Sequence, residues 1–220
     1  MNRIPEKELM DTTEQAQAYA DADYSGPHDA FVTYFKTRFP DFTGGHVLDL
    51  GCGPADVIIR FAKSFPETVM TGLDGSQEML AIGINNVKNG GFSGRITLRN
   101  CLLPDNSLPA HEFDTVISNS LLHHLTDPAV LWHTIKRCAK PGASIFVMDL
   151  LRPESTHQAD QLVKLHASDA PPILRDDFYN SLLAAYQTDE VKLQLSITGM
   201  DFLSIETVSD RHLIVWGTAE

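Results

Sequence analysis

The segment HVLDLGCGPADVIIRFA, residues 46–62, constrains the fold of this chain more than any other. Residues 47–50 are apolar apart from one aspartate, which predicts the end of a buried strand. Gly51 and Gly53 follow on either side of a cysteine, and glycines there permit a tight turn and a close approach of a ligand to the backbone. Helical spacing begins at residue 54, so the first amides of that helix would point at the turn. The segment therefore predicts a strand, a ligand-binding turn and a helix in succession.

Short apolar runs and amphipathic stretches alternate along most of the chain. Strands are predicted at residues 45–50, 68–73, 95–99, 113–118 and 144–150. Helices are predicted at residues 54–65 and 76–89, with Ser76 as the N-cap of the second. Another helix is predicted after Asp127, its N-cap, with Pro128 at the first helical position. This alternation is typical of a parallel sheet with helices on both faces.

The C-terminal end departs from that alternation. Residues 202–208 and 212–217 both have strand-like patterns, and only a few residues around Ser209 separate them. A parallel pair needs a connection of about a dozen residues or more, so these two strands must form an antiparallel hairpin. We therefore expect an α/β fold with a Rossmann-like seven-stranded sheet. The sheet would be mostly parallel with an antiparallel C-terminal strand, and helices would cover both faces.

Two segments lie outside the regular alternation of strands and helices. Residues 1–40 precede the first strand and are predicted to form an N-terminal helical cap. The remaining residues, 41–220, are expected to form one domain, in which residues 152–187 would be a substrate-cap insertion. Both segments are expected to cover the carboxyl ends of the strands, where open α/β sheets bind ligands.

Composition and charge limit the classes of partner. The formal net charge of −12 over 220 residues would repel polyanions, so we expect no nucleic-acid and no membrane partner. No apolar run reaches the roughly 20 residues of a membrane span, and the polar first residues do not resemble a signal peptide. The three cysteines are widely spaced and odd in number, which favours free thiols in a reducing cytoplasm.

Two acidic residues at neighbouring strand ends indicate the kind of ligand. Asp49 stands directly before the glycine turn and suits a cationic group, whereas Asp74, in VMTGLDGS, suits the two hydroxyls of a ribose. A nicotinamide cofactor is the rival interpretation, but its third fingerprint glycine is replaced by Asp56. Acidic side chains at this turn also disfavour a pyrophosphate. A ribonucleoside with a cationic amine, such as S-adenosylmethionine, fits better.

Several motifs in order resemble those of class I S-adenosylmethionine-dependent methyltransferases. VLDLGCGPA resembles their first motif, and GLDGSQEML resembles their second-strand motif. RNCLLP, FDTVISNSLLHHLTDPAVLW and KPGASIFVMDLLRP are similar to the later motifs of the small-molecule branch, which includes the ubiquinone/menaquinone-type methyltransferases. The resemblance covers roughly residues 45–150. The reversed last strand of that family agrees with the predicted C-terminal hairpin.

The resemblance implies a set of cofactor-binding residues. Those for the methionine part would be Asp49, Gly51, Cys52 and Gly53. Asp74 would hold the ribose, while Gly75 and Met79 would lie along the adenosine. The residues that frame the adenine would be Asn100, Cys101 and Leu102, although the family commonly has aspartate at the first of these positions. Asn119 would lie near the methyl-bearing sulfonium.

Methyl transfer from a sulfonium is an in-line displacement, so the protein must mainly position the acceptor and accept its proton. Candidates for the catalytic base are His124, His123 and Asp149, in that order, because they follow the fourth and fifth strands. Weaker candidates for substrate contact are Tyr19, Tyr24, His28, Arg152, His166 and Arg175. No metal site is expected, because metal-ligand spacings are absent and His123 and His124 should face different directions.

The expected function is therefore methyl transfer from S-adenosylmethionine to a small molecule. A non-catalytic cofactor-binding or interaction module on the same fold is the alternative, because a fold does not guarantee an activity. A nicotinamide-dependent oxidoreductase is a third interpretation. The sequence leaves open the acceptor, the methylated atom and the oligomeric state.

Overall fold

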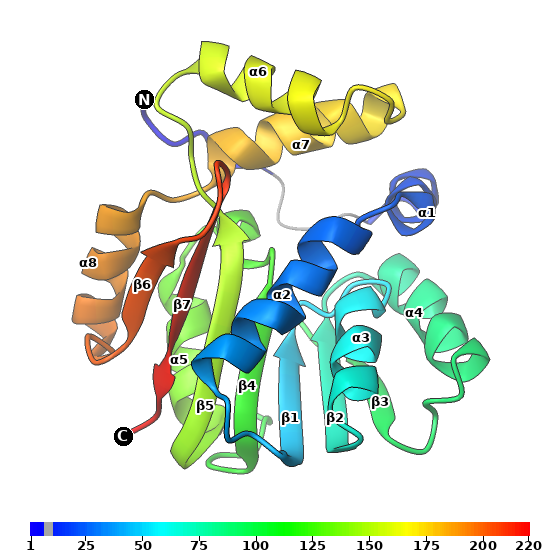
Figure 1. Cartoon of the computed structure of the whole chain (residues 1–220), viewed down its shortest axis with the longest axis vertical. Coiled ribbons are helices and arrows are strands. Elements are labelled where there is room, and N and C mark those ends of the chain that lie inside the picture. The colour runs from blue at the N-terminus through cyan, green and yellow to red at the C-terminus, as the bar shows by residue number, and fades with distance from the viewer. Residues whose placement is uncertain (7–10) are drawn as a thin grey trace.

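A seven-stranded mixed sheet forms the centre of the computed structural model, which describes residues 1–6 and 11–220 (Figure 1). The strand order is β3-β2-β1-β4-β5-β7-β6. The strands are β1 (Gly44–Leu50), β2 (Glu67–Asp74), β3 (Ile96–Asn100), β4 (Phe113–Asn119), β5 (Ala139–Leu150), β6 (Ser204–Thr207) and β7 (His212–Thr218). Strands β1 to β5 pair in parallel, while β7 pairs antiparallel with both β5 and β6. The predicted fold class and the C-terminal hairpin are confirmed.

Two strands begin at residues clearly different from the predicted ones, while the other strand boundaries differ by at most one residue. Strand β5 begins at Ala139, earlier than residue 144, because Ala139 pairs with Phe113 before a register shift in β4. Strand β6 begins at Ser204 instead of residue 202. Its predicted start is lost because the amide of Leu203 donates to the carbonyl of Met200 in a turn, 3.1 Å away, and is not available to the sheet.

Eight α-helices and one short 3-10 helix lie in the described part of the chain. They are α1 (Thr13–Asp21), α2 (Ser25–Arg38), α3 (Asp56–Ser64), α4 (Gln77–Asn89), η1 (Leu122–His124), α5 (Ala129–Cys138), α6 (Thr156–His166), α7 (Pro172–Ala184) and α8 (Thr188–Thr198). Ser76 caps α4 as predicted, since its side chain accepts a hydrogen bond from the amide of Met79 at 3.2 Å. Helix α5 begins at Ala129, one residue later than expected, with Pro128 at the N-cap.

Alternating strand residues supply two separate cores. Val47 of β1 and Phe146 of β5 pack on the face covered by α2 and α3, in front of the sheet in Figure 1. Leu48 and Val147, their neighbours along the chain, pack on the other face with residues of α5 and α8. Because successive strand side chains point to opposite faces, apolar residues at both positions require a sheet buried on both sides.

The N-terminal segment, residues 1–40, has two different places in the fold. Helix α2 covers a sheet face, and its Phe31 makes an edge-to-face contact with Phe146, with ring centroids 4.9 Å apart. Helix α1 lies at the carboxyl ends of the strands and contacts α4 and α7. Residues 7–10 of the predicted cap lie outside the described residues.

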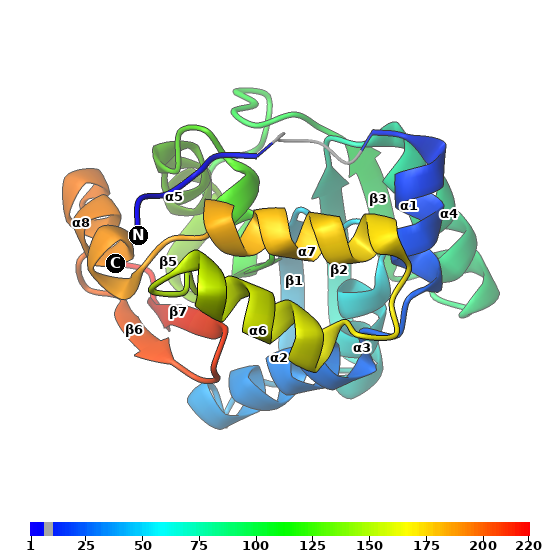
Figure 2. The ribbon, with the colours of Figure 1, turned by 90° about the horizontal axis from the view of Figure 1, so that it is seen from above.

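Helices α6 and α7 lie above the carboxyl ends of the strands, as Figures 1 and 2 show. They form a small core of their own with Leu150 at the end of β5, to which Leu162 and Leu182 contribute. The two helices therefore form a roof over the edge at which α/β sheets bind ligands, and a substrate-cap role for residues 152–187 stays a prediction.

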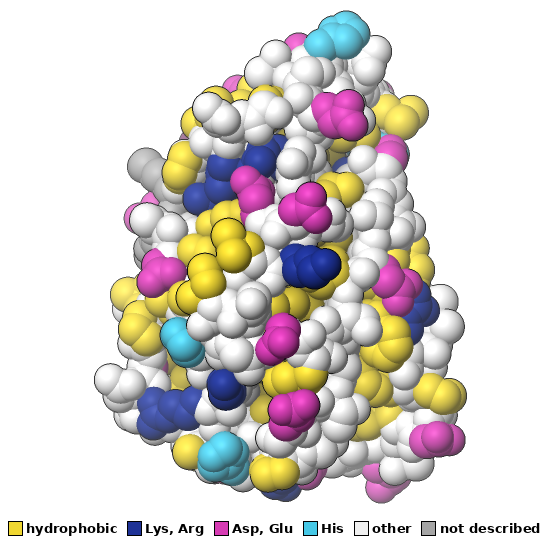
Figure 3. Space-filling model, turned by 90° about the vertical axis from the view of Figure 1, so that its left-hand side faces the viewer, with side chains coloured by type: hydrophobic (Ala, Val, Ile, Leu, Met, Phe, Trp, Pro, Cys, Tyr) yellow, Lys and Arg dark blue, Asp and Glu magenta, His cyan; other side chains and the backbone are white. Residues whose placement is uncertain are grey.

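The surface mixes charged and apolar side chains. On the side of the molecule that carries α8, acidic and basic side chains are interspersed with yellow apolar ones (Figure 3). No helix among the described residues combines the length and hydrophobicity needed to cross a bilayer. All three cysteines, Cys52, Cys101 and Cys138, are free and buried.

Candidate active site

A cavity of about 680 Å³ lies at the carboxyl ends of the strands. Its floor is the turn after β1 together with the ends of β2 and β4, and its roof comes from α1, α6 and α7. A second cavity of about 40 Å³ shares Gly51, Gly53 and Asn119 with the first and extends toward Asp49. The larger volume is in the range of small-molecule binding sites.

Glycine is required at the turn between β1 and α3 for two different reasons. Gly51 has φ +77°, and a Cβ there would come within 3.0 Å of the Cβ of Leu121. Gly53 has φ +50°, and a Cβ there would meet no protein atom within 4 Å, because it would point into open space beside the cavities. Ala55 completes the turn with φ +70° before α3 starts. The turn is therefore left-handed at three positions and bare on its cavity side.

Asp49 is almost completely buried, at 1% exposure, at the end of β1. Its Oδ2 has no hydrogen-bond partner among the described residues, and the side chain lines the smaller cavity. Burial, reinforced by the charge of Asp74, raises the pKa of Asp49 to about 8. The Oδ1 of Asn119 is another buried acceptor without a partner in the described structure, and it lines the same cavity. Two acceptors at one cavity suit a ligand that brings hydrogen-bond donors and positive charge.

Asp74 at the end of β2 already holds two backbone amides. Its Oδ2 accepts from Gly53 at 2.7 Å and its Oδ1 accepts from Ser76 at 2.8 Å. Burial raises the pKa of Asp74, and these two hydrogen bonds oppose the shift. The carboxylate therefore fixes the glycine turn and the start of α4 while facing the larger cavity.

The start of α3 carries a carboxylate, Asp56, whose pKa is lowered. Although burial acts to raise the pKa of Asp56, hydrogen bonds from His28 at 2.6 Å and Arg60 at 2.7 Å lower it to about 2. This charge lies where a pyrophosphate would need the helix N-terminus, which argues against a dinucleotide. His28 also continues a row of rings, with centroids 4.7 Å apart for Tyr19 and Tyr24 and 5.6 Å apart for Tyr24 and His28. All three rings line the larger cavity.

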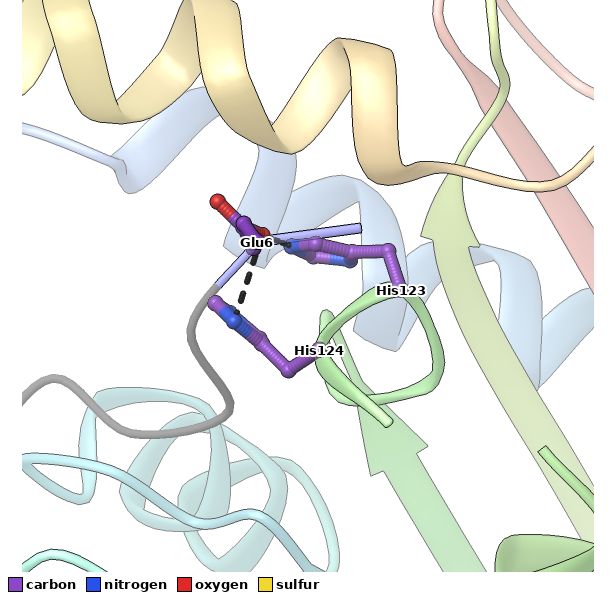
Figure 4. A group of neighbouring side chains, drawn as sticks. All are labelled: Glu6, His123 and His124. Atoms are coloured by element: carbon purple, nitrogen blue, oxygen red, sulfur yellow. Dashed lines mark ion pairs between the residues drawn. The ribbon is translucent and has the colours of Figure 1, made fainter. Parts of the chain in front are cut away.

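His123 and His124 lie side by side in η1, after β4, with ring centroids 4.2 Å apart. The expectation that they face different directions is wrong, because both rings turn toward Glu6 (Figure 4). His123 Nε2 is 3.5 Å and His124 Nδ1 is 3.2 Å from Oε1 of Glu6. Asp149 holds His123 from the other side, with 2.6 Å between Asp149 Oδ1 and His123 Nδ1. Burial acts to lower the pKa of His123, but the charge of Asp149 and its hydrogen bond raise it overall.

Comparison with known proteins connects this geometry with a family. The family described as "Methyltransferase domain" matches residues 47–142, which run from the middle of β1 into β5. Residues 47–142 belong to the class I S-adenosylmethionine-dependent methyltransferases. The methyltransferase domain therefore includes the glycine turn, Asp74 and both histidines of η1.

Two curated relatives match the methyltransferase domain and its surroundings. A ubiquinone/menaquinone biosynthesis C-methyltransferase of Geobacter sulfurreducens is 29% identical over 113 residues, covering 51% of this chain and 44% of the relative. A demethylmenaquinone methyltransferase of Bacillus subtilis is 32% identical over 112 residues, covering 50% of this chain and 48% of the relative. The matches thus span less than half the length of each relative.

A solved structure extends the likeness to nearly the whole chain. The structure of a SAM-dependent methyltransferase from Aquifex aeolicus superposes with a TM-score of 0.68, covering 93% of this chain and 98% of that protein. Its sequence identity is 19%, so the likeness shows a shared fold. The superposed part therefore extends well beyond residues 47–142.

Most of the residues that the methyltransferase resemblance implies lie at the two cavities. Those at the larger cavity are Gly51, Gly53, Asp74, Gly75, Met79, Cys101, Leu102 and Asn119. Asp49 and Cys52 line the smaller one. Asn100 is an exception, because its side-chain nitrogen donates to the backbone carbonyls of Asp74 at 3.1 Å and Gly75 at 3.0 Å and is exposed. It supports the strand end and does not line either cavity.

The candidates for substrate contact also divide into residues that line the larger cavity and residues that do not. Arg152 is buried away from the cavities of the methyltransferase domain, where it donates to the carbonyl of Ala185 and pairs with Glu190 at 2.8 Å. His166, which was expected to point at the core or at the pocket, is the last residue of α6, lines the larger cavity and pairs with Asp210 at 2.7 Å. Arg175 is exposed on α7 and is not a lining residue.

Sequence reasoning missed Glu6 and Ser181, which meet at the histidine pair. The hydroxyl of Ser181 on α7 donates to Oε2 of Glu6 at 3.2 Å. Glu6 precedes the methyltransferase domain and has no motif around it, and only the three-dimensional path of the N-terminal segment brings it to η1. A glutamate in a polar segment such as NRIPEKE gives no signal that distinguishes it from a surface residue.

Proposed function

We propose that this chain transfers the methyl group of S-adenosylmethionine to a small-molecule acceptor. The observation that carries this proposal is the buried carboxylate of Asp49 beside the bare glycine turn, because its Oδ2 has no hydrogen-bond partner among the described residues. A cationic group is what such a carboxylate stabilises best, because the ion pair recovers the cost of burying the charge. The methyl donor of the Aquifex aeolicus protein, named in its description as SAM, has both the cation and the ribose that this site suits.

The proposed cofactor position follows from the lining residues. Asp49 and Asn119 accept hydrogen bonds from the amino group, and the turn from Gly51 to Gly53 lies along the methionine part. Asp74 receives the ribose hydroxyls, in addition to the two amides that it already holds. Met79, Cys101 and Leu102 form an apolar wall for the adenine. Asn100 has no direct part in this arrangement.

Bound S-adenosylmethionine supplies an electrophilic methyl carbon on a positively charged sulfur. The acceptor attacks this carbon in line with the carbon–sulfur bond, which breaks and leaves S-adenosylhomocysteine. Among the protein groups, His124 is the proposed recipient of the acceptor's proton, because its ring lines the larger cavity. His123 is held by Asp149 and is the second candidate. Asp149 itself accepts from the amide of Leu122 at 2.8 Å and positions the pair.

The roof of the larger cavity indicates the acceptor class. Leu165, Leu174 and Phe178 present apolar surface, while Asp177 and Ser181 present polar groups near the histidine pair. We infer an acceptor with an apolar body and at least one polar group at the reacting end. The net charge of −12 supports small molecules over nucleic acids. The three free, buried thiols support a reducing compartment such as the cytoplasm.

Formation of S-adenosylhomocysteine tests the proposal. The purified chain is incubated with isotopically methyl-labelled S-adenosylmethionine and fractionated small-molecule extracts, and the label is followed into extracted products. We expect labelled products and equimolar S-adenosylhomocysteine with the wild type, and neither with Asp49→Asn. Tight binding of S-adenosylmethionine without turnover in any fraction would favour a non-catalytic module instead.

A further inference from the structure

The group of Glu6, His123 and His124 forms a cluster of possible metal ligands at the wall of the larger cavity. One possible ligand atom from each residue lies within 4.8 Å of those of the other two. The two histidines come from η1 and Glu6 comes from the N-terminal segment, and Figure 4 shows the three side chains meeting. The side chains of His123, His124 and Glu6 are only 3%, 16% and 14% exposed. A buried pair of imidazoles and a carboxylate is a donor set that zinc-type ions prefer.

Two of the three spacings in this group match those of a zinc coordination sphere. The distances from Glu6 Oε1 to the two histidine nitrogens are 3.5 and 3.2 Å. Ligands held about 2.0–2.1 Å from zinc at tetrahedral angles lie about 3.4 Å apart. Glu6 Oε1 is buried and has no hydrogen-bond partner among the described residues, despite its two close neighbours. The three atoms thus face a common space.

Neighbouring residues form hydrogen bonds that hold the three candidate ligands in place. Asp149 lies 2.6 Å from Nδ1 of His123, which fixes the ring and leaves Nε2 to face Glu6. Ser181 donates to the second oxygen of Glu6. Arg3 anchors the segment before Glu6, because its Nη2 donates to the carbonyls of His123 at 2.8 Å and Leu125 at 3.2 Å. Metal-binding histidines commonly have such a carboxylate on the second ring nitrogen.

The cluster also has an open side. His123 and His124 line the larger cavity, so a fourth position next to an ion would face the proposed acceptor. Catalytic zinc sites have three protein ligands and one such open position, whereas structural sites are closed by four. The carboxylates of Glu6 and Asp149 on two sides of His123 supply the negative charge that a divalent cation needs.

We propose that Glu6, His123 and His124 bind one divalent transition-metal ion of the zinc type at the cavity wall. Binding of the ion does not depend on the proposed function, but the catalytic role of the ion rests on the proposed function. An acceptor oxygen at the open position would lose its proton more readily, so the ion would take the part otherwise given to His124. Magnesium is not the expected ion, since it prefers oxygen ligands.

The test is metal binding by the untagged, chelator-treated protein. Zinc content is measured after equilibration and removal of unbound metal, and Co²⁺ is titrated as a spectroscopic probe. We expect one zinc per chain and an intense visible Co²⁺ spectrum that zinc, but not millimolar Mg²⁺, abolishes. Glu6→Gln and His124→Ala should weaken zinc binding by at least about 100-fold, because outer-shell partners alone contribute about 10- to 100-fold.

The control variant is His157→Ala, because His157 is an exposed histidine on α6 that contacts Gln161 and does not line the cavity. Zinc binding that is equal in wild type, Glu6→Gln and His124→Ala would overturn the proposal. A circular dichroism spectrum and unfolding midpoint near the wild-type values exclude misfolding of the variants. Methyl transfer that persists in protein unable to bind zinc would refute the catalytic role of the ion and leave the proposed function intact. Stoichiometric zinc binding without S-adenosylhomocysteine formation would support the metal site and contradict the proposed function.

Discussion

Asp49 is the residue whose ionisation connects the site to pH. Its pKa is about 8 without a ligand, because burial and Asp74 both disfavour the charged form. A cationic ligand favours the charged form, so binding must release a proton at neutral pH. Affinity for S-adenosylmethionine should therefore rise between pH 6 and about 7.5, by up to about tenfold per pH unit, and level off near pH 8. Calorimetric titration in buffers of different ionisation enthalpy measures both the affinity and the proton release.

The matched variant for this prediction is Asp49→Asn, which retains the shape of the side chain without its titration. Any pH dependence that comes from the amino group of the ligand will be present in the wild type and the variant alike. The difference between the two therefore isolates Asp49. Identical slopes in both proteins would show that this carboxyl does not face the cation.

The same carboxyl should reduce the stability of the ligand-free protein at high pH. Its folded pKa of about 8 lies above the unfolded value near 4, so the native state binds more protons than the unfolded state across this window. The free energy of unfolding must then fall as pH rises from about 4 to 8. Asp49→Asn should therefore be more stable than the wild type at pH 8 and about equally stable at pH 4. Urea unfolding at both pH values measures this, and a destabilised variant at pH 8 would contradict it.

The turn between β1 and α3 is the element that admits the ligand. Gly53→Ala should fold with a loss of about 1–2 kcal/mol, since the new Cβ has room but φ is positive. Gly51→Ala should cost more, because its Cβ would also meet Leu121 at 3.0 Å. The Cβ at residue 53 would point into the cavities, so the milder variant should still lose affinity for S-adenosylhomocysteine. Thermal unfolding measures the order of the two stability losses, and calorimetry measures the affinity for S-adenosylhomocysteine. An affinity of Gly53→Ala equal to that of the wild type would contradict the proposed ligand position.

Helices α6 and α7 form a roof that has its own small core. Leu182 of α7 is fully buried in that core, while Leu195 of α8 is 1% exposed in the core on the sheet face opposite α2. Each leucine-to-alanine change should cost about 2–5 kcal/mol. Only Leu182→Ala should increase hydrogen exchange selectively in the amides of α6 at low denaturant, because the roof can open without the sheet. Equal exchange from α6 in both variants would mean that the roof is not an independent unit.

At the scale of the whole molecule, local patterns predicted the sheet because its signals are local. Apolar runs such as residues 113–118 are buried on both faces, and the short connection at Ser209 allowed only a hairpin. The boundaries were harder, since the amide of Leu203 is taken by a turn that no periodicity reveals. Helix α2 was expected in a cap, yet its phenylalanines complete a sheet face. Amphipathic spacing does not tell which apolar surface a helix will cover.

The residues of the site are of two kinds: those that local motifs predict, and those that only the fold brings to the cavity. The strand-end acids and the glycine turn lie at the cavities because parallel strands bring their carboxyl ends to one edge. Arg152 was expected to contact the substrate. The sequence does not show that its guanidinium instead pairs with Glu190 and donates to the carbonyl of Ala185. Glu6 was missed because it reaches His124 only through the folded path of the chain.

The central claim is that two neighbouring carboxylates hold a cationic ribonucleoside, and calorimetric titration with S-adenosylmethionine and with NADH tests it directly. The comparison uses wild type, Asp74→Ala and Asp114→Ala; Asp114 also accepts a backbone amide, that of His46 at 2.8 Å, but does not line either cavity. Both variants should lose stability, about 1–2 kcal/mol per hydrogen bond removed. We predict that wild type and Asp114→Ala bind S-adenosylmethionine but not NADH, and that Asp74→Ala binds neither. Tight NADH binding by the wild type, or unchanged S-adenosylmethionine affinity in Asp74→Ala, would contradict the account.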